Sequence, residues 1–75
     1  MRERIVHSAD CSSKTLLRIA KRAGFVCFAS KKHWKLSTVD GVFVTMIPRH
    51  ERLKRELVKG IVIRMNEFGA EITLR

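Results

Sequence analysis

Side chains able to carry out chemistry gather around one histidine of this sequence. His33 follows Lys31 and Lys32, and Lys35 comes two residues later. An imidazole changes charge near neutral pH and transfers protons, and lysines hold phosphate and stabilise charge that develops on it. RNA carries its own nucleophile, the 2′-hydroxyl group, so its cleavage needs a base and cations rather than a metal. A single histidine in a short basic protein is more often an ordinary surface residue, so residue types alone leave both interpretations open.

Motifs for metals and cofactors are lacking. His7, His33 and His50 are dispersed along the sequence. Cys11 and Cys27 have no metal-type or redox-type spacing. The seven acidic residues form no close cluster, and there is no glycine loop of the kind that holds nucleotide phosphates. We therefore expect no metal and no small-molecule cofactor, and the low cysteine content favours a reduced, cytoplasmic protein.

The charge is strongly positive and concentrated. Sixteen lysines and arginines against seven acidic residues give +9 over 75 residues. No acidic residue stands between Asp10 and Asp40, a stretch that contains Lys14, Arg18, Lys21, Arg22, Lys31, Lys32 and Lys35. Such a surface attracts phosphate and favours a nucleic-acid partner; the alternative is a solvated basic surface that keeps the protein soluble. No apolar run approaches the roughly 20 residues of a membrane helix, so we expect no membrane partner.

The first predicted element is a helix that extends to about Ala23. Ser12 and Ser13 are candidate N-caps, and Gly24 suits the C-terminal stop. Residues at three- and four-residue spacing form its apolar stripe, namely Leu16, Leu17, Ala20 and Ala23. Another face collects Lys14, Arg18, Lys21 and Arg22.

Three strands follow, over residues 25–29, 33–37 and 42–47. The turn at Asp40-Gly41 separates the last two, and Pro48 closes the third. Alternation places His33 and Lys35 on one face of the second strand, with Trp34 and Leu36 on the other. We expect Trp34 and Phe43 to lie in the core rather than to stack on bases.

The C-terminal part is less clearly patterned. Leu57, Ile61, Met65 and Phe68 recur at helical spacing, with Val58 and Val62 beside them, and Gly69 is a plausible stop. Gly60 and the β-branched residues 61–63 leave a strand at 61–64 as an alternative. Residues 1–11 are interpreted as a flexible N-terminal extension, 12–69 as one domain, and 70–75 as a tail or a short edge strand. The fold class is α+β: an α-β-β-β-α sandwich like that of double-stranded-RNA-binding domains, with two helices on one face of a three-stranded antiparallel sheet.

Several segments, in this order and spacing, resemble the HicA toxins of bacterial toxin–antitoxin pairs. Residues 12–25 are similar to the family's first helix and its glycine-aromatic exit. His33-Trp34-Lys35-Leu36 resembles the segment that carries the active-site histidine, and Ile47-Pro48-Arg49-His50 resembles the proline-basic-histidine stretch after the third strand. Leu57 to Gly69 resembles the last helix. The similarity covers about residues 12–69.

This resemblance implies a function and a partner. HicA toxins are mRNA interferases of type II toxin–antitoxin systems: they cleave messenger RNA independently of the ribosome and are covered by a HicB-type antitoxin. Carried over by position, the catalytic role falls to His33 alone. The predicted RNA-binding residues are Lys14, Arg18, Lys31, Lys32, Lys35, Arg49 and His50.

One departure from the family pattern keeps other functions open. Family members often carry a glycine and a serine shortly before this histidine, where Ser30-Lys31-Lys32 stand here. The first alternative is therefore a non-catalytic module that binds RNA without cutting it. The second is a protein whose positive face mainly docks an acidic antitoxin.

Overall fold

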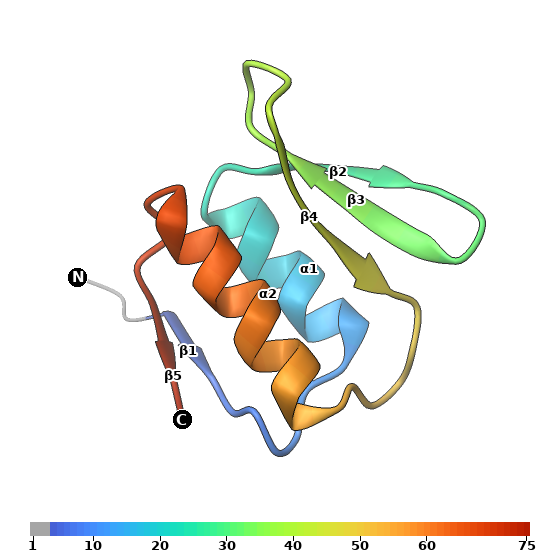
Figure 1. Cartoon of the computed structure of the whole chain (residues 1–75), viewed down its shortest axis with the longest axis vertical. Coiled ribbons are helices and arrows are strands. Elements are labelled where there is room, and N and C mark those ends of the chain that lie inside the picture. The colour runs from blue at the N-terminus through green and yellow to red at the C-terminus, as the bar shows by residue number, and fades with distance from the viewer. Residues whose placement is uncertain (1–3) are drawn as a thin grey trace.

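The computed structural model describes residues 4–75. Its central part consists of two helices and a three-stranded sheet. The elements are β1 (Arg4–Val6), α1 (Ser13–Arg22), β2 (Val26–Ala29), β3 (His33–Ser37), β4 (Phe43–Pro48), α2 (Arg55–Glu67) and β5 (Ile72–Leu74). Both helices lie on the same side of the sheet β2-β3-β4 (Figure 1). The predicted α-β-β-β-α arrangement is confirmed, with β1 and β5 added at its ends.

Helix α1 begins and ends as its sequence predicts. The Ser12 hydroxyl accepts a hydrogen bond from the Thr15 N–H at 3.3 Å, which satisfies one of the free donors of the first turn. At the other end the Gly24 and Phe25 N–H groups donate to the carbonyls of Lys21 and Ala20, and Gly24 has a φ of +95°. This left-handed position favours glycine and turns the chain directly into β2.

The sheet is an antiparallel meander with one face against the helices. Leu36 of β3 lies opposite Cys27 of β2 and Thr45 of β4, and Trp34 lies opposite Ile47. Leu36, Val44 and Ile47 have no exposed surface. They form the core together with apolar side chains of α1 and α2. Because residues alternate along a strand, the other face carries the neighbours of these residues.

Helix α2 settles the open alternative at residues 61–64 in favour of a helix. Its buried side chains are Val58, Ile61, Val62 and Met65. Burial of this stripe against β4 and β5 outweighs the small helix penalties of Gly60 and the β-branched residues. Leu57, which was expected in the apolar stripe, is 38% exposed because it lies beside that stripe rather than on it.

The chain ends differ from the expected flexible extension. Residues 1–3 lie outside the described part, but β1 pairs in parallel with β5, from Arg4 opposite Ile72 to Val6 opposite Leu74. Val6 and Cys11 are buried, and the Arg75 N–H donates to the Val6 carbonyl at 2.8 Å. Residues 4–11 are thus part of the folded unit. For 70–75, the short-strand alternative is the one that forms, on the side of the helices away from the larger sheet (Figure 1).

Candidate nucleic-acid interface

The turn between β2 and β3 holds His33 at one end of the sheet. Both the N–H and the hydroxyl of Ser30 donate to the His33 carbonyl at 2.9 Å. The Arg49 N–H donates to the Lys32 carbonyl at 3.2 Å, which joins the end of β4 to the same turn. Lys31 and Lys32 are exposed at its tip. The backbone on both sides of His33 is therefore fixed, while cationic side chains extend from it into solvent.

His33 and Lys35 lie on the face of the sheet that no helix covers, the open face. His33 lies opposite Pro48, and Lys35 lies between Phe28 of β2 and Met46 of β4. Directly paired residues share a face, so these side chains stand together, away from Leu36 and the helices. The predicted division of β3 into a His33/Lys35 face and a Trp34/Leu36 face agrees with this register.

Phe43 corrects the expectation that it lies in the core. Its side chain is 45% exposed, and the Lys35 Nζ lies 5.7 Å from the centre of its ring. The physical reason is a register irregularity between Leu36 and Ser37, which lets Val44 rather than Phe43 fill the core position. Phe43 therefore belongs to the open face.

Trp34 is partly buried, and its indole ring contacts the side chain of Arg49. Its side chain packs against the core. The Arg49 guanidinium carbon lies 4.6 Å from the centre of the indole ring, a cation–π contact. This stack and the hydrogen bond to Lys32 together define where Arg49 lies. The expectation of a core Trp34 holds for only part of the side chain.

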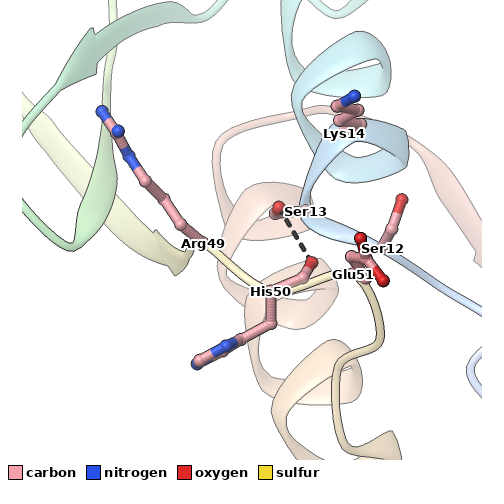
Figure 2. Close-up of a pocket in the computed structure, with 6 residues that line it drawn as sticks. All are labelled: Ser12, Ser13, Lys14, Arg49, His50 and Glu51. Carbon is pink, nitrogen blue, oxygen red and sulfur yellow. Dashed lines mark hydrogen bonds between the residues drawn. The ribbon is translucent and has the colours of Figure 1, made fainter.

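A hollow of about 420 Å³ lies where the chain between β4 and α2 crosses the start of α1. The residues that line it are Ser12, Ser13, Lys14, Arg49, His50 and Glu51 (Figure 2). The His50 carbonyl accepts hydrogen bonds from the Ser13 N–H at 3.1 Å and the Ser13 hydroxyl at 3.0 Å. Figure 2 shows the side chains of Lys14, Arg49 and His50 pointing in different directions. They line the hollow without converging on one point.

The structure brings most of the predicted site residues to one end of the sheet. His50 comes two residues after Pro48, the cross-strand partner of His33, so both histidines lie at that end. Lys14 lies in the first turn of α1, beside His50, and Arg18 is exposed one turn further along the same helix. Arg18 is four residues after Lys14 on α1, so the two exposed side chains lie on one side of the helix.

Burial raises the pKa of both cysteine thiols. The pKa of Cys11 is raised by burial and, to a smaller extent, by the negative charge of Asp10. The pKa of Cys27 is also raised by burial, which the positive charge of Lys21 partly offsets. A raised pKa leaves less of the reactive thiolate at neutral pH. Neither cysteine therefore has the lowered pKa of an activated nucleophile.

Within residues 4–75, no group of three or more histidine, cysteine or acidic side chains is placed so as to hold a metal ion. Neither helix in this part of the chain is long and apolar enough to span a membrane.

Comparison with protein-family models found no match, and comparisons with curated proteins and with solved structures found no significant one. The resemblance to HicA toxins therefore remains a prediction from the residues and their spacing.

Besides Phe43, two side chains of the open face and one contact at its edge were not anticipated from the sequence. Phe28 is 55% exposed and Met46 is 40% exposed, both beside Lys35. The alternation of residues 26–29 and 43–47 contained a signal for them, but each run is apolar on both faces and leaves the register undetermined. No sequence signal indicates the stacking of Arg49 on Trp34, because it depends on how β4 leaves the sheet.

Proposed function

We propose that this protein is a metal-independent endoribonuclease, the toxin component of a type II toxin–antitoxin system, with His33 as its general base. The observation that carries the proposal is the position of His33 on the open face, at the sheet end where Lys31, Lys32 and Arg49 emerge. Among residues 4–75, no hydrogen bond engages either ring nitrogen of His33. The imidazole is therefore available to a substrate.

The reaction needs only groups of this chain and of the RNA. The neutral imidazole of His33 accepts the proton of a 2′-hydroxyl group, whose oxygen then attacks the adjacent phosphorus. A bond forms between the 2′ oxygen and phosphorus, and the bond from phosphorus to the 5′ oxygen breaks. The leaving 5′ oxygen takes up a proton from solvent. The products are a cyclic phosphate, which water can open, and a 5′-hydroxyl end.

Cations near His33 have the complementary role of holding phosphate. Lys32 and Lys35 flank the histidine, and Lys31 precedes them in the same turn. Positive charge placed where the phosphorane forms stabilises the transition state more than the ground state. Lys14, Arg18, Arg49 and His50 extend the positive surface from the sheet end onto α1 and would position the rest of the strand.

The partner that this proposal includes is a HicB-type antitoxin that covers the site, and the setting is the cytoplasm. Free toxin would then arrest growth by cutting messenger RNA. The basic surface fits an acidic inhibitor as well as it fits RNA, because both present negative charge.

The test is digestion of a mixed single-stranded RNA by purified protein in excess chelator, with His33→Ala and His50→Ala side by side. We expect His33→Ala to lower the cleavage rate about 100-fold or more, the usual contribution of a general base, and His50→Ala to retain most of it. Products should carry cyclic or 3′-phosphate ends. Circular dichroism checks that all three proteins are folded.

Other outcomes have definite meanings. Equal cleavage by the native chain and His33→Ala would reject His33 as the base. Loss of activity in chelator, restored by a divalent ion, would reject the metal-free reaction. RNA binding without cleavage by any of the proteins would support the non-catalytic binding module.

A further inference from the structure

The open face of the sheet combines exposed rings with positive charge. Phe28 on β2 and Phe43 on β4 are 55% and 45% exposed; Lys35 on the middle strand lies opposite Phe28, and its Nζ lies 5.7 Å from the centre of the Phe43 ring. The two rings stand on strands two spacings apart, roughly 10 Å. Met46, 40% exposed, continues the apolar surface beside Lys35. Large side chains of this kind are normally buried, so their gathering on one face indicates a binding surface.

The positive charge of the open face favours one class of binding partner over the others. Strands β2, β3 and β4 contain no acidic residue, and their basic side chains, His33 and Lys35, both belong to the open face. An apolar protein or lipid surface would gain from the rings but would leave Lys35 without a counter-charge. A strand of RNA offers both complements, because bases stack on rings while phosphates pair with cations.

We propose that Phe28 and Phe43 are stacking platforms for unpaired bases of a single-stranded RNA, with Lys35 holding the phosphate between them. This inference rests on the proposed function and names its substrate class: unpaired rather than double-stranded RNA. Paired bases are stacked within a helix and cannot lie on protein rings, so a duplex would use the cations alone. His33 is on the same face, two residues before Lys35 along β3, so a strand of RNA held at Phe28 and Lys35 would pass close to the imidazole.

The stacking contribution is separable from the electrostatic one. Binding is measured by fluorescence anisotropy in the His33→Ala background, which removes cleavage from the measurement. The probes are an unstructured ten-nucleotide RNA, an abasic oligomer with the same number of phosphates, and a duplex of the same length. We expect Phe28→Ala and Phe43→Ala each to weaken binding of the single strand roughly five- to a hundredfold and to leave the abasic and duplex probes unchanged.

The matched control is Ile63→Ala, which removes an apolar side chain that is 59% exposed but lies on α2. It should leave all three affinities unchanged. Phe28→Leu and Phe43→Leu keep most of the apolar volume and remove the ring, so they should behave like the alanine variants. Denaturant unfolding of each variant confirms that the fold persists.

Unchanged binding of the single strand by both phenylalanine variants would overturn the proposal and leave the face to a protein partner. Equal losses on the single strand and the abasic oligomer would also overturn it, because the rings would then act without bases. Neither result depends on whether the native chain cleaves RNA. Conversely, absence of cleavage with the expected binding losses would reject the nuclease and keep the stacking surface.

Discussion

The two faces of the sheet β2-β3-β4 are built from neighbouring residues of the same strands, yet they differ in burial and in charge. On the covered face, Leu36 and Ile47 have no exposed surface and pack against both helices. On the open face, one residue away along each strand, Lys35 and Met46 meet solvent. The covered face holds the fold together, and the open face is free to vary in chemistry. Function on this small domain is therefore to be sought where stability does not depend on the side chain.

The largest expected effect is a difference in stability between the two faces. Leu36→Ala should lower the free energy of unfolding by about 2–5 kcal/mol, because it leaves a cavity at a fully buried position. Phe28→Ala, on the adjacent strand but on the open face, should cost about 1 kcal/mol or less. Urea unfolding followed by circular dichroism measures both. A loss for Phe28→Ala as large as that for Leu36→Ala would show that the open face is structural.

Helix α2 also has a buried side and an exposed side, and a substitution of Gly60 tests the exposed side. Gly60 is exposed on α2, and a Cβ added there meets nothing within 4 Å. Gly60→Ala should therefore raise the free energy of unfolding by about 1 kcal/mol, the helix preference of alanine over glycine. The same unfolding experiment measures the gain. A loss of stability would contradict a helix at this position.

A smaller effect is expected at the edge where the two faces meet. Arg49→Ala removes the cation–π contact with Trp34 and should lower the free energy of unfolding by about 0.5–1 kcal/mol. Arg49→Lys, which retains the charge but not the planar guanidinium, should recover only part of the loss. Tryptophan fluorescence reports the change directly, since Trp34 is the only tryptophan of the chain. An unchanged emission spectrum in Arg49→Ala would argue against the stack.

The smallest effect concerns thiol reactivity on the two faces. Burial raises the pKa of Cys27, on the covered face, above the ordinary 9.0, so less thiolate is present at neutral pH and alkylation is slow. A thiol introduced in Cys27→Ser/Phe28→Cys would stand on the open face and should react several-fold faster with iodoacetamide at pH 7.5. The native Cys27 rate should keep rising with pH beyond 9.0. Equal rates at the two positions would remove the distinction between the faces.

Much of the secondary structure could be predicted from residues that are close together in the sequence. The Ser12 cap, the Gly24 stop and the alternation of residues 33–37 each act within a few residues, so the first helix and the middle strand were predictable. For the same reason the His33/Lys35 pairing on one face followed from the strand alone. These features rest on backbone geometry and hydrogen bonds between near neighbours.

Other features depend on contacts between distant residues, which no local pattern encodes. Phe43 was predicted in the core, but a register irregularity opposite Ser37 turned it outward and placed Val44 inside. The parallel pairing of β1 with β5 joins the two chain ends, whose three-residue strands carry too little pattern to predict.

By itself, the sequence determined the charge, the limits of the first helix and the order of the two helices and three central strands, whereas the resemblance to a nuclease stays a prediction. Only the tertiary structure showed which apolar side chains are exposed to solvent. It also showed that residues 61–64 are helical and that Arg49 stacks on Trp34. The physical reason is that burial is a property of packed layers. A strand with apolar residues on both faces acquires an inside and an outside only when the helices cover one of them.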